Sequence, residues 1–149
     1  MTSRFFSLRR ACLCAMGCLL MAGYLSRAAA QTAEAPLPVP ALWQGLGIST
    51  WPVASPDLAL LFDEIVLPGV VPVRLRSKLQ FTQKLVLFAQ PPGAPEAMTQ
   101  LASFALSSKS GPQALFSYQA SATRNLILLA QTPSGWFMVE RQLKVGHKQ

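Results

Sequence analysis

The chain has 149 residues, of which 51% are hydrophobic, and its 13 basic and 6 acidic side chains give a formal net charge of +7. All three cysteines precede residue 19, so the rest of the chain can form no disulfide, thiolate metal site or cysteine nucleophile. From Gln31 onward the net charge is only +3, without the dense basic face expected of a nucleic-acid binder.

The N-terminus has the pattern of a secretory signal peptide over residues 1–30. Arg4, Arg9 and Arg10 precede an apolar run (Ala11–Leu25) and a small-residue site that ends at Ala30. Cleavage after Ala30 would release a periplasmic or secreted protein with no part left in the membrane. The alternative is a retained membrane anchor, but an anchor needs about 18 or more apolar residues, which is longer than this run. The paired arginines leave the export route open between the general secretory and twin-arginine pathways.

A proline-rich leader is predicted over residues 31–57, ahead of one folded domain over residues 58–149. Within the leader, Ala41–Gln44 has the pattern of a short helix that Gly45 ends. Residues 49–56 contain two prolines and are expected to lack regular structure. We expect Trp51 to anchor this segment onto the core.

Seven segments after residue 57 either alternate apolar and polar residues or are short and apolar throughout, as β-strands do. They are Leu58–Val66, Val70–Arg76, Lys84–Ala89, Leu101–Leu106, Ala114–Gln119, Asn125–Gln131 and Trp136–Val145. Turn residues separate them and almost no helix is expected. The sequence therefore predicts an all-β fold, an immunoglobulin-like antiparallel β-sandwich of about seven strands with a short N-terminal helix.

Two of these segments allow a more specific placement. Pro72 cannot donate a ladder hydrogen bond, so its strand is expected at a sheet edge or at a bulge. Asn125–Gln131 is the most apolar segment, which favours a central strand covered on both faces. In the last segment Arg141 interrupts the apolar row, and we expect its stem to pack at the sheet margin while its head reaches water.

The residues that carry chemistry do not form a recognisable catalytic or metal-binding constellation. The single histidine, His147, lies three residues from the end, and Asp63 and Glu64 should point to opposite faces of a strand. No phosphate loop, nucleophile elbow or dinucleotide fingerprint occurs. We therefore expect a protein that is not an enzyme and that needs no cofactor or metal.

Two surface features are candidates for a partner-binding site. Arg74, Arg76 and Lys78 occupy alternate positions and should project from one face, with Lys84 nearby, which would suit an acidic partner. The alternative is that this row is simply the solvated side of a sheet. Trp136 and Met138 share the nominally polar side of the last strand, and they are either an exposed apolar patch for a partner or part of the core.

The order of several short motifs resembles that of a known family. The motifs are Asp63-Glu64-Ile65 with Val71-Pro72-Val73 beyond a turn, Leu85–Phe88 with Pro91-Pro92, Leu101–Leu106, and Thr123–Leu126 running through Gly135 to Gln142–Val145. In this order they resemble the SoxY family, immunoglobulin-like sulfur-carrier subunits of the periplasmic Sox sulfur-oxidation system. The resemblance covers about three-quarters of the chain that follows the signal peptide. It implies a sandwich that takes part in thiosulfate oxidation and pairs with a second immunoglobulin-like subunit, SoxZ.

The resemblance breaks at the C-terminus. The family carries sulfur on the cysteine of a Gly-Gly-Cys-Gly-Gly tail after the last strand, whereas here Gly146 is followed by His147, Lys148 and Gln149. No carrier residue can be assigned, because the sulfur linkage needs a thiolate. The expectation is thus a SoxY-like protein that binds a SoxZ-like subunit or another periplasmic redox partner without carrying sulfur. The alternative is an unrelated secreted immunoglobulin-like module that binds a component of the cell envelope.

Overall fold

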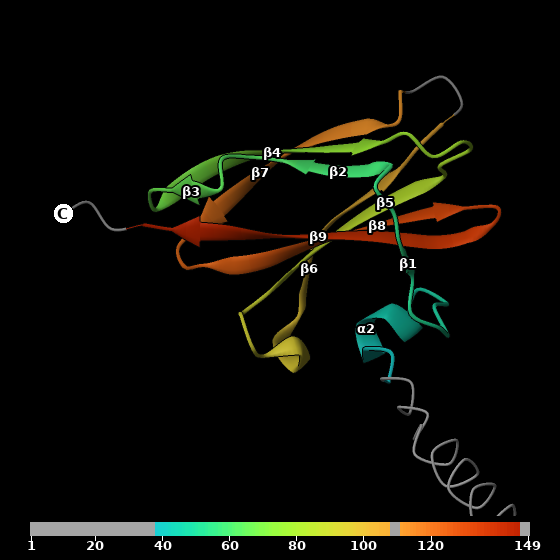
Figure 1. Cartoon of the computed structure of the whole chain (residues 1–149), viewed down its shortest axis with the longest axis horizontal. Coiled ribbons are helices and arrows are strands. Elements are labelled where there is room, and N and C mark those ends of the chain that lie inside the picture. Colours follow the sequence, from blue (N-terminus) through green and yellow to red (C-terminus); the bar gives the residue numbers. More distant parts are fainter. Residues whose placement is uncertain (1–37, 108–110, 147–149) are drawn as a thin grey trace, which may run out of the picture. The chain divides into compact units, whose positions relative to one another are not determined.

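Two β-sheets form the body of the computed structural model, which describes residues 38–107 and 111–146 (Figure 1). The large sheet has the order β1-β9-β8-β5-β6, with β3 also paired to β9, and the small sheet has the order β2-β4-β7. This arrangement confirms the predicted immunoglobulin-like sandwich. The predicted signal peptide and the tail after Gly146 lie outside the described residues, and within them no helix is both long and apolar enough to cross a membrane.

The elements of the two sheets are bounded as follows. The large sheet consists of β1 (Val53–Ala54), β3 (Ile65–Val66), β5 (Lys84–Gln90), β6 (Thr99–Ala105), β8 (Arg124–Thr132) and β9 (Gly135–Val145). The small sheet consists of β2 (Leu58–Leu61), β4 (Gly69–Ser77) and β7 (Gln113–Ala120). Two short helices complete the described chain, α2 (Ala41–Gln44), as predicted, and the 3₁₀ turn η1 (Pro95–Ala97).

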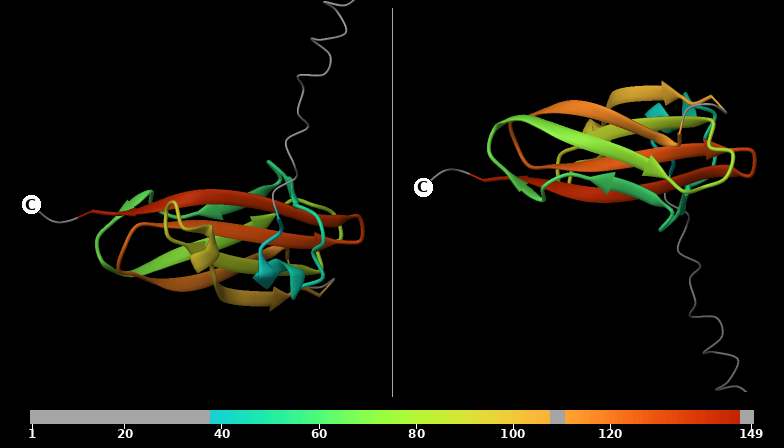
Figure 2. Two further views of the ribbon diagram at one scale, coloured as in Figure 1. Left: turned by 90° about the horizontal axis from the view of Figure 1, so that it is seen from below. Right: turned by 90° about the horizontal axis from the view of Figure 1, so that it is seen from above.

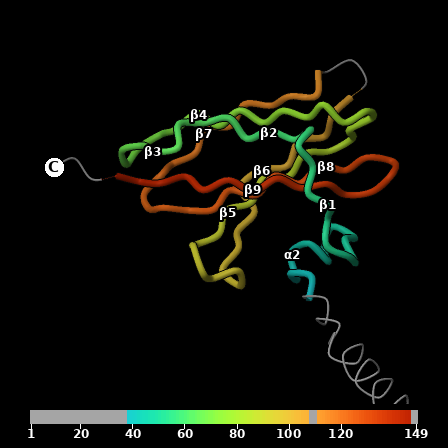
Figure 3. The backbone as a smooth tube through the Cα atoms, viewed as in Figure 1, coloured from blue at the N-terminus to red at the C-terminus, as the bar shows by residue number. Residues whose placement is uncertain are grey.

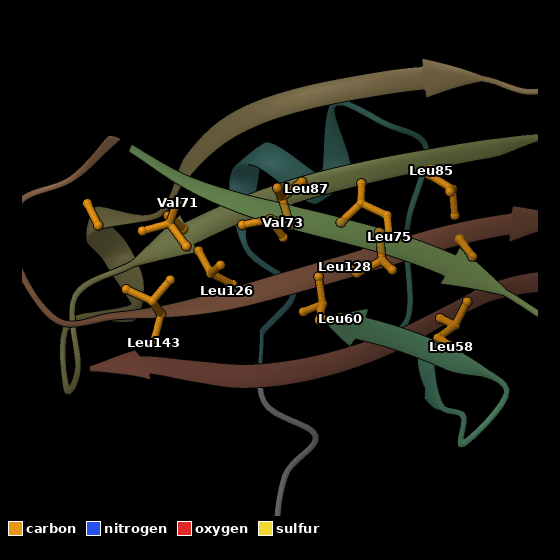
Figure 4. Packing of buried hydrophobic residues seen from close by; sticks show 13 residues of the cluster. Leu58, Leu60, Val71, Val73, Leu75, Leu85, Leu87, Leu126, Leu128 and Leu143 are labelled. Atoms are coloured by element: carbon orange, nitrogen blue, oxygen red, sulfur yellow. The ribbon is translucent and has the colours of Figure 1, made fainter. Parts of the chain in front are cut away.

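The main core fills the space between the two sheets. Figure 2 shows the strands of the sandwich from below and from above. Val71, Val73 and Leu75 point inward from β4, as their alternation predicts. Residues of β2, β5, β8 and β9 meet them, and Figure 4 shows these side chains together: Leu58, Leu60, Leu85, Leu87, Leu126, Leu128 and Leu143. Each fully buried leucine of this kind stabilises the fold by about 1.5–3 kcal/mol relative to an exposed one.

A second apolar cluster covers the opposite face of the large sheet. Val86 and Phe88 of β5 and Ile127 and Leu129 of β8 lie in it, so both strands are buried on both faces. This confirms the prediction of a central strand at Asn125–Gln131. The cover comes from Trp43, Ile48 and Met98. Residues 38–57, which the sequence assigned to a leader, are therefore packed on the sheet in the same compact unit as the sandwich.

The first predicted strand, Leu58–Val66, is wrong as a single element. It is divided at Phe62–Glu64 into β2, which pairs with β4 of the small sheet, and β3, which runs parallel to the end of β9. Residues 49–56 were expected to be irregular, yet they contain β1, which pairs parallel with β9 at Phe137 and Met138. The chain thus pairs with β9 at β1, crosses to the small sheet at β2, and pairs with β9 again at β3. This path can be followed in Figure 3.

The prediction that the strand of Pro72 lies at a sheet edge or at a bulge was wrong, because β4 is the central strand of the small sheet and pairs without a register shift. β2 pairs only with Arg74–Ser77 of β4, so Pro72 has a neighbour on the β7 side alone. The N–H of Ser77 donates to the Pro112 oxygen beside β7 at 2.8 Å. Alternation along the strand therefore turns the Pro72 nitrogen to the side that β2 leaves open, and no ladder hydrogen bond is lost.

Candidate functional site

The predicted basic row lies on the side of the small sheet that faces away from the core, which we call the outer face. Arg74 and Arg76 are exposed there, and Lys78 follows directly after β4, also exposed. Arg76 and Lys78 line one shallow depression together with Ser77, Pro112 and Gln113. Lys84 belongs to the large sheet, where it is half-buried and paired with Ala105 and Gln131, so it does not extend the row.

Exposed apolar side chains surround Arg74 on the outer face. Register places Leu61 of β2 on one side of Arg74 and Leu115 of β7 on the other. Leu61 is 41% exposed, Leu115 is 64% exposed, and Val70 further along β4 is 69% exposed. None of the three strands contains an acidic residue, and within the described residues Arg74 forms no ion pair. The face therefore combines apolar surface with positive charge that nothing in its strands neutralises.

Arg141 joins the two sheets across one side of the sandwich. Its Nη1 donates a hydrogen bond to the backbone oxygen of Leu60 at 3.0 Å, and its guanidinium carbon lies 4.8 Å from the centre of the Phe62 ring. Arg141 is half-buried and lines a surface hollow, which agrees with the predicted place at the sheet margin. The sequence did not predict that the cation would also satisfy a carbonyl of β2 and lie over an aromatic ring at the end of that strand.

Arg74 and Arg141 both line one hollow where β2 ends, which we call the edge depression. It has a volume of about 340 Å³ and is lined by Leu61, Phe62, Asp63, Val71, Pro72, Arg74, Leu115 and Arg141. Sequence reasoning did not find it, because its residues come from four separate segments that only the strand register brings together. The one feature of the sequence that pointed to this hollow was Arg141, a charged residue within the apolar row of the last strand.

Trp136 and Met138 are half-buried and pack against the second apolar cluster. The cover is not the neighbouring sheet but the segment around α2, where Trp43 is buried. Trp51 meets Trp43 edge-on, with ring centres 4.9 Å apart, in agreement with its predicted anchoring role. The side of β9 that carries Trp136 and Met138 is therefore largely part of the core.

The acidic pair Asp63-Glu64 lies in the loop between β2 and β3 and not within a strand. Asp63 lines the edge depression, and Glu64 forms an exposed ion pair with Lys144 at 3.1 Å. Over residues 38–107 and 111–146, no three His, Cys, Asp or Glu side chains come together in a way that could hold a metal ion. His147 lies outside the described residues.

Comparison with known proteins gives likenesses of fold. No family model and no curated protein sequence matches the chain. The sulfur carrier protein SoxY from Chlorobium limicola f thiosulfatophilum matches in structure with a TM-score of 0.57 and 20% identity, over 70% of this chain and 94% of its own. Superoxide reductase (neelaredoxin) from Ignicoccus hospitalis matches with a TM-score of 0.56 and 15% identity, over 60% of this chain and 80% of its own. Two proteins with different functions thus share this sandwich.

Proposed function

We propose that the chain is an exported SoxY-like module that acts by binding another protein and does not carry sulfur. The likeness in fold to the SoxY sulfur carrier supports the relationship, as does the order of the sequence motifs along the strands. The composition argues against the carrier step itself, because no cysteine follows Cys18 and the sulfur linkage requires a thiolate.

The observation that carries the proposed binding role is the composition of the outer face. Arg74 stands between two exposed leucines on a face whose strands contain no acid. Arginine beside exposed apolar side chains is a common composition for the centre of a protein interface. A partner that fits this surface would present carboxylates around an apolar patch.

The expected partner is a SoxZ-like subunit or another periplasmic redox protein with such a surface. Size-exclusion chromatography of the mature protein mixed with a candidate SoxZ-like subunit at micromolar concentration should give one joint peak. Two separate monomer peaks would count strongly against this pairing.

The same mixture identifies the surface that the partner contacts. Arg74→Glu should weaken binding by about tenfold or more, because it places a carboxylate opposite the partner's acidic groups. Lys84→Glu is the matched control, since it makes the same change of charge on the large sheet and should leave binding near the wild-type level. Equal effects of the two variants would mean that only net charge matters and that the outer face is not the interface.

The second candidate is an unrelated secreted immunoglobulin-like binding module of the cell envelope. This candidate is supported by the likeness to neelaredoxin, whose TM-score is nearly equal to that of SoxY. A fold shared by proteins of different function does not by itself indicate a role in sulfur oxidation. Neighbouring genes that encode Sox-type haem proteins or a SoxZ-like subunit would favour the first candidate, and their absence would favour the second.

A further inference from the structure

The lining of the edge depression contains two arginines and one aspartate. The arginines are Arg74 of β4 and Arg141 of β9. The one acid in the lining, Asp63, forms an ion pair with neither arginine, since the only ion pair among the described residues joins Lys144 and Glu64. Two arginine residues thus line one hollow, and neither forms an ion pair within the described residues.

Both arginines keep hydrogen-bond donors free for a ligand. A guanidinium has five N–H donors in a planar fork. Arg141 uses one of them on the Leu60 oxygen, and its guanidinium carbon lies over the Phe62 ring. Arg74 makes no hydrogen bond or ion pair within the described residues. The Arg141 side chain is therefore held in place, whereas the Arg74 side chain can turn toward a ligand.

The remainder of the lining is mostly apolar. Five of its eight residues have hydrocarbon or proline side chains or an aromatic ring: Leu61, Phe62, Val71, Pro72 and Leu115. The volume of about 340 Å³ is near the lower limit for ligand pockets, which run from about 300 to 1,000 Å³. The hollow thus fits a small group with an apolar part, and Asp63 disfavours a ligand with a high negative charge.

We propose that the edge depression binds a small apolar group that carries a single carboxylate. The carboxylate lies between Arg74 and Arg141, where bidentate arginine contacts are available, and the apolar part packs against Leu61 and Leu115. The group is either a free aromatic or aliphatic acid or the C-terminal residue of a peptide, since both present the same chemistry. This binding does not require the SoxZ-like partner, so either proposal can fail without the other.

Benzoate is the first probe, and two-dimensional NMR of the ¹⁵N-labelled mature protein is the measurement. Benzoate should produce saturable shifts of the amide signals of Leu61, Phe62, Asp63 and Leu115 at millimolar concentration. Benzamide, which has the same ring without the charge, should bind at least about tenfold more weakly, as expected for the loss of charge-assisted hydrogen bonds. Equal binding of benzamide, or no saturable shift with benzoate, would overturn the proposal.

Matched arginine variants separate the edge depression from the general positive charge of the outer face. Arg74→Gln should weaken benzoate binding by about three- to tenfold. Arg76→Gln removes the same charge two positions along the same face, but Arg76 does not line the depression, so this variant should bind as the wild type does. Equal losses in the two variants, or equally strong binding of sulfate, would show a diffuse anion-attracting surface and contradict the proposed site.

A second titration distinguishes the two sources of the carboxylate. The probes are the peptide acetyl-Ala-Ala-Leu with a free C-terminal carboxylate and the same peptide with a C-terminal amide. A free-acid peptide that binds more tightly than benzoate, while its amide does not bind, identifies a chain end as the natural occupant. Tighter binding of benzoate identifies a free acid. Equal binding of acid and amide peptides would contradict recognition of the carboxylate.

Discussion

At the scale of single residues, Phe81 stands out because its backbone and its side chain are both unfavourably placed. It lies in the loop between β4 and β5 with φ of 56°, in the left-handed region, and its side chain is 77% exposed. The loop is held by hydrogen bonds around Ser77, which is buried: Ser77 Oγ lies 2.8 Å from Thr82 Oγ1 and accepts from the N–H of Leu79 at 3.1 Å. These contacts impose the conformation that Phe81 adopts.

We predict that Phe81→Asn stabilises the protein. Left-handed backbone costs an ordinary L-residue about 1–2 kcal/mol, and asparagine tolerates it better. The lost ring is mostly exposed, so little apolar burial is lost with it. The gain should be about 0.5–1 kcal/mol, seen as a rise in the urea midpoint and an increase in Tm of about 4 °C.

Phe81→Ala is the control for this prediction. Alanine removes the ring just as asparagine does, but it retains the steric penalty at positive φ, so its stability should stay at or slightly below the wild-type value. If both variants lose stability to the same extent, the contacts of the ring and not the backbone angle determine the effect.

At the scale of elements, alternation within a strand predicted what each strand buries but not which sheet it joins. The inward positions Leu58, Leu60 and Phe62 have the same parity as Val66, and only Glu64 interrupts this apolar row where the chain changes from one sheet to the other. One charged residue is a weak sign of a division, because Arg141 interrupts the apolar row of β9 in the same way without dividing that strand. β1 has only two residues and both are exposed, which leaves no pattern to detect.

The candidate site was only partly predictable for the same physical reason. The outward direction of Arg74 and Arg76 follows from alternation in one strand. The adjacency of Leu61, Arg74 and Leu115 follows from the register among three strands, and register depends on tertiary packing. The contact between Arg141 and the Leu60 oxygen crosses between the sheets, so no local pattern contains it.

The short helix α2 depends on one side chain for its position. Four residues cannot form a stable helix alone, and Trp43 is fully buried against Phe88, with ring centres 6.3 Å apart. We predict that Trp43→Ala lowers the free energy of unfolding by about 3–5 kcal/mol. It should also uncover the second apolar cluster, which an increase in the fluorescence of a hydrophobic dye would report.

Leu42→Ala is the matched control on the same helix. Leu42 is 44% exposed, so its loss should change stability by less than about 1 kcal/mol and leave dye binding unchanged. Trp43→Phe should be milder than Trp43→Ala, because Nε1 of Trp43 has no hydrogen-bond partner in the described part of the chain and its removal leaves nothing unsatisfied. Equal losses for Trp43→Ala and Leu42→Ala would contradict the role of Trp43 as the anchor.

At the scale of the whole molecule, the likeness to a sulfur carrier is a likeness of fold. The sandwich matches that of a SoxY sulfur carrier, and the end of β9 is secured by the N–H of Gly146, which donates to the Val66 oxygen at 2.9 Å. The residue after Gly146 is histidine and not cysteine.

Intact-mass spectrometry tests whether the chain carries sulfur. We predict that the wild-type protein from Gln31 onward, incubated with thiosulfate and the oxidising Sox enzymes, gains no mass, because a persistent sulfur adduct requires a thiolate to form a sulfur–sulfur bond. An adduct on the wild type would contradict this. His147→Cys places a thiol directly after Gly146, so an adduct on that variant alone would mean that the enzymes still recognise the sandwich. No adduct on either protein, under conditions where an authentic SoxY is modified, would favour the unrelated binding module.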